Sequence, residues 1–252
     1  YQMAWHQAIE KAEGRADLFE LKRQTETLRN FDYRKQDQPN WKKILFQPVY
    51  TEGLKKLQDL AQNLWWSWNY EAISLFKSID PDRWEEVEQN PIPMMEGLSK
   101  KQMEALEKDT AFLEKLNKVY EAFKSYMSQA PRYEDLIAYF SMEYGLHKSL
   151  KIYSGGLGIL AGDYLKEASD SGASMLGIGL LYRYGYFTQD ISLFGDQLAQ
   201  YIPQKFTHLP LEPVRDEKGN WVTISIAFPG RNVVAKAWKV NVGRVPLYLL
   251  DT

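Results

Sequence analysis

The stretch AYFSMEYGLHKSLKIYSGGLGILAGDYLKEASDSGASMLGIGLLYRYGYFTQ, residues 138–189, decides the fold class. An apolar run leads into a glycine-rich turn, a segment with helical spacing follows, and a second apolar run closes the stretch. Strand, turn, helix and strand in this order predict an α/β fold. They also place the start of a helix directly after the turn, where anions bind.

The turn SGGLG, Ser154 to Gly158, is the candidate ligand site. The adjacent glycines Gly155 and Gly156 permit positive φ and let a ligand approach the backbone closely. Ser154 is expected to cap the helix, whose first amides have no partner within it. A phosphate or sugar oxygen would be stabilised there by these amides and the helix dipole. A second interpretation stays open, since many α/β proteins place glycines here only to make the turn.

The helix after the turn is predicted from its apolar spacing, which marks one buried face. Gly172 stands where the helix is expected to stop. After it, the run from Met175 to Phe187 predicts a buried parallel strand. The expected buried face consists of Leu157, Leu160, Ala161, Tyr164, Leu165 and Ala168, and the expected opposite face of Asp163, Lys166, Glu167 and Asp170.

Composition limits the function classes. The 252 residues are 44% hydrophobic and 25% charged, which is enough to bury a core of one large or two modest domains. A formal charge of -2 argues against a general nucleic-acid surface, and the absence of cysteine excludes disulfides and thiolate metal sites. No apolar run approaches the length of about 18 residues that a membrane span needs, and the N-terminus has no secretory signal pattern, so we expect a cytoplasmic protein. No metal site is predicted.

The chain before the α/β segment divides into two parts. Residues 2–29 favour one or two helices, with His6 at a surface or packing position. Residues 31–43 favour a linker, so a module boundary is expected near residue 47.

Residues 48–130 predict a small helical domain with a tryptophan-rich core. The segment WWSWN, residues 65–69, could instead present tryptophans to a sugar, but three tryptophans in four positions cannot all face one way, which favours burial.

From residue 131 to residue 252 the spacing becomes typical of strands. Lys218, Gly219 and Asn220 predict a tight turn, after which residues 221–251 are expected to form an antiparallel meander. The expected strands are LIAYFSM, MLGIGLLY, WVTISIAF, VVAKAWKV and VPLYLLD.

Several of these motifs together resemble the glycogen and starch phosphorylases, and most closely their short bacterial and archaeal branch. The motifs are AYFSMEYGLHKSL, YSGGLGILAGDYLKEASDSG, GIGLLYRYGYFTQ, NLWWSWN and DPDRW, and the match covers about residues 48–252. The resemblance implies an N-terminal helical domain followed by the first part of a Rossmann-like domain of a two-domain glycosyltransferase fold. It also implies phosphorolysis of terminal α-1,4-glucosidic bonds, with an α-1,4-glucan and inorganic phosphate as partners and pyridoxal 5'-phosphate as cofactor.

The same resemblance assigns site residues. Gly155, Gly156, Leu157 and Gly158 match the loop that meets the substrate phosphate and glucosyl unit, and Glu143 matches a glutamate near the sugar pocket. Longer animal-type members have a tyrosine where this chain has Gly145. The candidate pocket residues are His147, Ser154 and Arg183; His147 is either a proton donor or a hydrogen-bonded loop residue, and Arg183 either faces the pocket or is solvated.

The chain begins at Tyr1 and stops directly after a strand-like run, so we expect an N-terminal fragment of a longer polypeptide. In the family the cofactor lysine lies downstream, so no catalytic residue is assigned and the fragment alone is predicted to be inactive. Residues 1–47 are compatible with the tail of a fused glucan synthase module, and oligomerisation stays open.

Two other functions are compatible with the sequence. A glycogen or starch synthase uses a similar Gly-Gly-Leu turn, but the nearest lysine here, Lys151, is three positions before Ser154. A non-catalytic glucan-binding module could be built on the tryptophan-rich helices.

Overall fold

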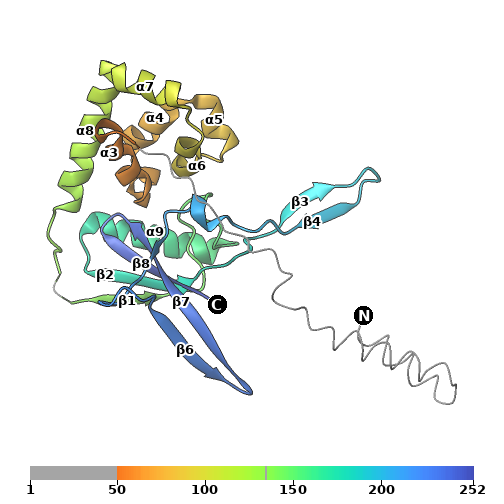
Figure 1. The fold of residues 1–252 in the computed structure, drawn as a ribbon. Coiled ribbons are helices and arrows are strands. Elements are labelled where there is room, and N and C mark those ends of the chain that lie inside the picture. Colours follow the sequence, from red (N-terminus) through yellow and green to blue (C-terminus); the bar gives the residue numbers. More distant parts are fainter. Residues whose placement is uncertain (1–49, 134) are drawn as a thin grey trace, which may run out of the picture. The chain divides into compact units, whose positions relative to one another are not determined.

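A computed structural model describes residues 50–133 and 135–252, all within the compact unit Gln47–Thr252. The helices predicted over residues 2–29, the linker at 31–43, His6 and the boundary near residue 47 lie outside these residues. The described chain is a mixed α/β structure, in which a series of helices is followed by a mixed sheet (Figure 1). None of the described helices combines the length and the apolar character that a bilayer span requires.

Helices fill the first part of the described chain, as predicted from its spacing. Their starts are fixed by local sequence signals: Asp80 accepts a hydrogen bond from the Arg83 amide at 3.0 Å, and Pro81 takes the first helical position. Ser99 and Gln102 form a reciprocal capping box. The helices are α3 (Glu52–Ala61), the 3-10 helix η1 (Leu64–Trp68), α4 (Tyr70–Ile79), α5 (Pro81–Glu86), α6 (Pro91–Glu96), α7 (Lys100–Lys108) and α8 (Thr110–Met127).

The core of these helices is rich in tryptophan, as predicted. Trp66 is 2% exposed and meets Phe76 and Trp84 edge-on, with ring centroids 5.8 Å apart in both pairs. Trp65, one position earlier, packs instead against Phe123, which shows how neighbouring tryptophans are buried in different directions. A stripe of apolar residues at helical spacing is also buried, and it consists of Leu54, Leu57, Leu60, Ala61 and Leu64.

Helix η1 joins the helical core to the core of the sheet. Leu64 belongs to the cluster around the sheet, whereas Trp65 belongs to the helical cluster. Next to them, the buried Asn63 donates to the Gly243 carbonyl and accepts from the Gly243 amide, both at 2.9 Å. Gly243 has φ +59° in the turn between two strands, a conformation that favours glycine. The helices and the sheet are therefore connected by buried polar contacts as well as apolar ones.

The sheet has six strands in the order β1-β2-β8-β7-β5, with β6 also paired to β7. The pairs β1–β2 and β2–β8 are parallel, and the remaining pairs are antiparallel. The predicted meander is thus confirmed, and its last strand continues the parallel part of the sheet. The strands are β1 (Ile137–Phe140), β2 (Met175–Leu180), β5 (Glu212–Pro213), β6 (Thr223–Phe228), β7 (Arg231–Val242) and β8 (Val245–Asp251).

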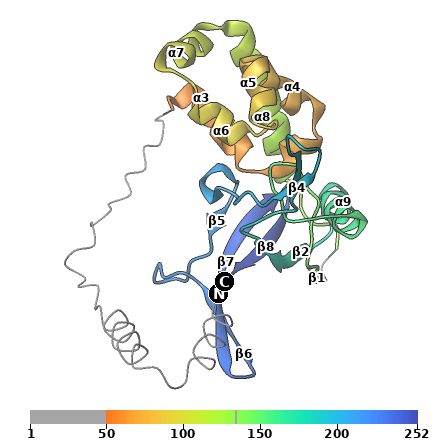
Figure 2. The ribbon, with the colours of Figure 1, turned by 90° about the vertical axis from the view of Figure 1, so that its right-hand side faces the viewer.

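One strand prediction needs correction, and one hairpin was missed. The parallel strand predicted over residues 175–187 ends at Leu180, because the chain then turns away from the sheet towards a separate hairpin. That hairpin, β3 (Thr188–Ile191) with β4 (Gln197–Gln200), was not predicted. It forms its own two-stranded sheet, which projects away from the six-stranded sheet in Figure 1; Figure 2 shows the strands β1, β2, β8 and β7 of that larger sheet from another side. The side chains of the hairpin are exposed, so no alternation of apolar and polar residues marks it in the sequence.

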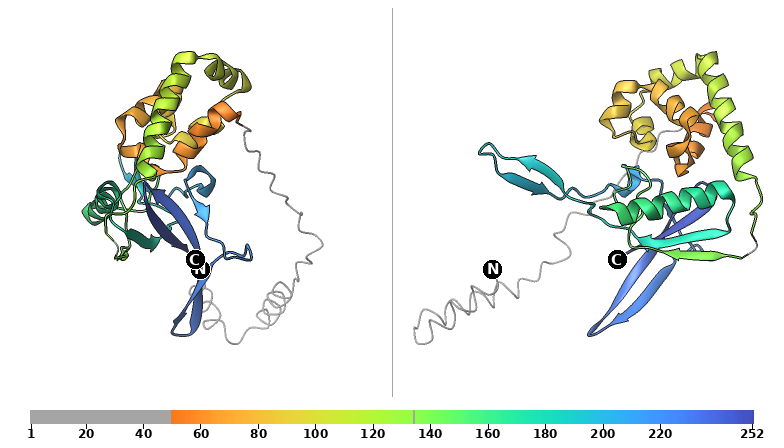
Figure 3. Two further views of the ribbon diagram at one scale, coloured as in Figure 1. Left: turned by 90° about the vertical axis from the view of Figure 1, so that its left-hand side faces the viewer. Right: turned by 180° about the vertical axis from the view of Figure 1, so that it is seen from behind.

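Helix α9 (Gly156–Ser171) lies against the sheet, and Gly172 ends it in the left-handed conformation as predicted (Figure 3). Its buried face differs from the prediction, since Leu157, Leu160 and Tyr164 are 60%, 65% and 45% exposed. The other predicted residues, Ala161, Leu165 and Ala168, are buried as expected. Gly158 and Gly162 complete the inner face, because the helix approaches its neighbours too closely there for a side chain. The buried residues are Gly158, Ala161, Gly162, Leu165, Ala168 and Ser169.

Candidate functional site

The glycine turn lies between the carboxyl end of β1 and the first turn of α9. Gly155 is the N-cap residue, with φ -160°, and Gly156 is the first residue of the helix. Neither adopts positive φ, so that part of the prediction is wrong. A Cβ on either glycine would have no neighbour within 4 Å. Within the described residues, the backbone conformation and the packing would both allow a larger residue here. A ligand that comes close to the backbone would instead require glycine.

Ser154 does not cap α9, which has no side-chain N-cap hydrogen bond. Its hydroxyl donates to Glu143 Oε1 at 2.7 Å, and its amide donates to Oε2 of the same carboxylate at 3.3 Å. The prediction failed because Gly155, and not Ser154, occupies the N-cap position, one residue further along the chain. The consequence is a carboxylate held at the glycine turn with a fixed orientation.

Two further glycines on α9 have a packing reason. A Cβ on Gly158 would come within 2.5 Å of the Tyr153 Cβ and 3.1 Å of Glu143 Oε2. A Cβ on Gly162 would come within 2.2 Å of the Gly145 carbonyl oxygen. Backbone cannot move aside as a flexible side chain can, so these glycines let α9 pack directly on the loop that carries Glu143.

His147 lies between that loop and the helices. Its ring meets Trp66 edge-on at 4.8 Å, and Nδ1 accepts a hydrogen bond from the Ser149 amide at 3.2 Å. Burial, with smaller contributions from the charges of Lys148 and Lys166, lowers the His147 pKa to about 4. The imidazole is therefore neutral at pH 7, which favours the hydrogen-bonded loop residue over the proton donor.

The remaining predicted residues lie around the turn without joining the Glu143–Ser154 pair. Leu157 points largely to solvent, and Arg183 is exposed, with its carbonyl accepting from the Gln204 amide at 2.8 Å. Tyr182, next to Arg183, is close enough to Glu143 that burial and then the glutamate charge raise its pKa. The structure thus brings Glu143, Ser154 and Gly158 together, with Tyr182 nearby, and leaves Arg183 at the surface.

Gln204 organises this region and was not predicted. Its side chain accepts from the Lys151 amide at 2.8 Å and donates to the Tyr182 carbonyl at 2.7 Å. It therefore ties the segment before the glycine turn to the segment after β2. No local pattern reveals this role, since its partners are far away in the sequence.

Within residues 50–133 and 135–252, no group of three or more His, Cys, Asp or Glu side chains is arranged to hold a metal ion. The chemistry available at the turn is that of the first backbone amides of α9 beside a carboxylate and a serine hydroxyl.

Comparison with known proteins gives this arrangement a family. A family described as "Protein of unknown function (DUF3417)" matches residues 50–150. Maltodextrin phosphorylase of Thermococcus litoralis is 43% identical over 209 residues, covering 80% of this chain and 25% of that protein. Glycogen phosphorylase of Aquifex aeolicus is 42% identical over 200 residues, covering 78% of this chain and 29% of that protein.

Glycogen phosphorylase of Mycobacterium tuberculosis is 38% identical over 216 residues, covering 80% of this chain and 25% of that protein. The chain thus spans about a quarter of the length of these relatives. They confirm the family resemblance predicted from the motifs.

Proposed function

Since this chain is homologous to the N-terminal quarter of prokaryotic glycogen and maltodextrin phosphorylases, we propose that it is part of an α-glucan phosphorylase. The whole enzyme would cleave terminal α-1,4-glucosidic bonds with inorganic phosphate and release α-glucose 1-phosphate. The single observation that carries the proposal is the open glycine turn at the start of α9, beside a carboxylate held by Ser154.

The two sides of the turn suit different parts of the substrates. The amides of Gly155 and Gly156 are at a helix N-terminus, and a Cβ on either residue would meet open space, which favours the approach of a phosphate oxygen or an anionic transition state. Glu143 would repel a phosphate but accepts hydrogen bonds from sugar hydroxyls. We therefore assign Glu143 and Ser154 to the glucosyl unit and the backbone amides of Gly155, Gly156, Leu157 and Gly158 to the phosphate.

The sheet agrees with a Rossmann-like domain that this chain does not contain in full. Strand β1, helix α9 and strand β2 form a parallel unit, and β1 is at the sheet edge with Ile137 and Phe140 exposed. Parallel strands are ordinarily covered on both faces. We propose that residues 48–130 are a helical domain, that residues 131–252 are the first part of the Rossmann-like domain, and that the rest of the enzyme covers β1.

Relatives of this family imply pyridoxal 5'-phosphate, and the lysines near the glycine turn do not fit its attachment. Lys151 pairs with Glu88 at 3.1 Å, and Lys166 lies 5.9 Å from the centre of the Trp68 ring. We therefore place the cofactor lysine in another part of the enzyme and assign no step of the reaction to the cofactor here. Purified chain is expected to show no internal-aldimine absorbance and no turnover; a cofactor band that survives dialysis would contradict this.

The other partners follow from the proposed reaction. An α-1,4-glucan and inorganic phosphate are the substrates, and no nucleic-acid or membrane partner is proposed, in line with a net charge of -2. We propose that the enzyme is cytoplasmic, because phosphate and glucans are both present in the cytoplasm.

One measurement separates this function from that of a glucan synthase. The polypeptide that contains this chain is expected to release glucose 1-phosphate from maltoheptaose when phosphate is added, and not to incorporate glucose from a nucleotide sugar. Nucleotide-sugar incorporation without phosphorolysis would refute the proposal. The Lys151–Glu88 ion pair already counts against the synthase, because it directs this lysine to the helices and away from the turn.

A further inference from the structure

The loop that carries Glu143 is anchored to the sheet by the next residue, Tyr144. This tyrosine is 0% exposed, and its hydroxyl lies between strands β1 and β2. The hydroxyl donates to the Tyr139 carbonyl at 2.8 Å and to the Ile178 carbonyl at 3.0 Å, so one proton is shared between the two strands. Burial raises the pKa of Tyr144 to about 12, and the hydroxyl therefore remains a donor at neutral pH.

Strand β2 has no side chains where the tyrosine ring lies. A Cβ on Gly179 would come within 2.7 Å of Tyr144 Cε2, and a Cβ on Gly177 would lie 3.5 Å from the Tyr144 hydroxyl oxygen. A side chain at position 179 would therefore displace the ring. The two glycines that interrupt the apolar run of β2 thus make room for a residue of the loop, and the ring has a single well-packed position there.

Glu143 is held on both sides by contacts of its neighbours. Before it, the Ser141 hydroxyl donates to the Glu143 carbonyl at 2.9 Å. After it, Tyr144 fixes the chain to the two strands. The carboxylate itself accepts from the Ser154 hydroxyl at 2.7 Å. Its position at the glycine turn therefore depends on the backbone anchors as well as on the serine.

We propose that Tyr144 is a positioning residue for the glucosyl unit, because its hydroxyl holds the Glu143 loop in the orientation that presents the carboxylate to the sugar. This inference rests on the proposed function and adds a residue to that site. The amides assigned to the phosphate belong to the start of α9 and not to this loop. Loss of the Tyr144 hydroxyl should therefore weaken the use of the glucan and leave the use of phosphate intact.

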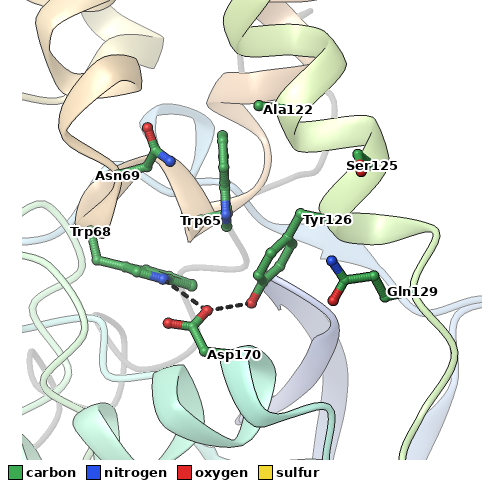
Figure 4. Close-up of a pocket in the computed structure, with 8 residues that line it drawn as sticks. All are labelled: Trp65, Trp68, Asn69, Ala122, Ser125, Tyr126, Gln129 and Asp170. Atoms are coloured by element: carbon green, nitrogen blue, oxygen red, sulfur yellow. Dashed lines mark hydrogen bonds between the residues drawn. The ribbon is translucent and has the colours of Figure 1, made fainter.

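The test compares two tyrosine-to-phenylalanine variants of the polypeptide that contains this chain. Tyr144→Phe keeps the buried ring and removes both hydrogen bonds of the hydroxyl. Tyr126→Phe is the matched control, because this hydroxyl also has two hydrogen bonds, one to Asp170 at 2.6 Å (Figure 4) and one with the Ser169 hydroxyl. These partners lie at the opposite end of α9, roughly 20 Å from the glycine turn.

We expect Tyr144→Phe to lower kcat/KM for maltoheptaose about tenfold, because a small displacement of a substrate-binding group is costly. The KM for phosphate should be unchanged, and Tyr126→Phe should leave both values unchanged. The same comparison in a Glu143→Ala background separates positioning from general loosening. Without the carboxylate, Tyr144→Phe should have no further effect, because residues that act through one contact are not additive.

Four results would overturn this inference alone: full kcat/KM in Tyr144→Phe, an equal rise of KM for glucan and phosphate, an equal loss in Tyr126→Phe, or a further tenfold loss in the Glu143→Ala background. An unmodified polypeptide that does not phosphorolyse maltoheptaose would overturn the proposed function, and this inference with it. The two failures are therefore distinguished by the activity of the unmodified protein.

Discussion

The same substitution at two positions of α9 should have opposite effects on stability. Gly162→Ala places a Cβ 2.2 Å from the Gly145 carbonyl oxygen, a backbone atom that cannot rotate away. Overpacking of this kind costs about 1–3 kcal/mol of folding stability. We expect a cost of about 3 kcal/mol here, because backbone atoms must shift to make room. Alanine offsets about 1 kcal/mol of this cost, because its helix propensity is higher than that of glycine. We expect a net loss of about 2 kcal/mol for Gly162→Ala.

Gly156→Ala is the matched control, because its Cβ would have no neighbour within 4 Å and the residue has no positive φ. Reduced freedom of the unfolded chain should leave it neutral or up to about 1 kcal/mol more stable. Urea denaturation of the two variants measures the difference, and the thermal midpoint of Gly162→Ala should fall by roughly 4–8 °C. Equal stability of Gly162→Ala and the parent chain would refute the close packing of α9 on the Glu143 loop.

Three further predictions concern stability. Asn63→Ala should lower the free energy of unfolding by about 3 kcal/mol in urea titrations, because both backbone groups of Gly243 lose their partner; a loss below about 1 kcal/mol would contradict this. Asp80→Ala should cost about 1 kcal/mol by removing the α5 cap, with an unchanged midpoint as the opposing result. His147 has a pKa of about 4 in the folded chain against 6.5 ordinarily, so protonation of the unfolded chain should reduce stability as pH falls from about 6.5 to 4. His147→Asn should flatten this dependence, and an equal slope in both proteins would refute it.

Local signals allowed much of the helical part to be predicted. The pair Asp80–Pro81 fixes a helix start from neighbouring residues alone, and the leucine stripe of α3 needs only a period of 3.6. The antiparallel strands after residue 221 were predictable for the same reason, since the turn at Gly219, with φ +81°, is encoded locally.

The face of α9 could be predicted only in part: Ala161, Leu165 and Ala168 are buried as expected, but hydrophobicity alone does not identify the rest of the face. Gly158 and Gly162 are buried for lack of a side chain, while the larger Leu160 stays exposed. In the candidate site, the position of the glycine turn followed from the sequence, but the pairing of Ser154 with Glu143 depends on a contact across the loop. Gln204 shows the same limit, as its partners meet only in the folded chain.

The central claim is that substrate binding, and not the fold, requires glycine at positions 155 and 156. Its most direct test is phosphate-dependent release of glucose 1-phosphate from maltoheptaose by the polypeptide that contains this chain, with and without Gly156→Ala. The account predicts a thermal midpoint that is unchanged or slightly raised and a fall in kcat/KM of about tenfold or more, because the new Cβ narrows the space in which the substrate approaches the turn. Full phosphorolysis by a stable Gly156→Ala variant would contradict it.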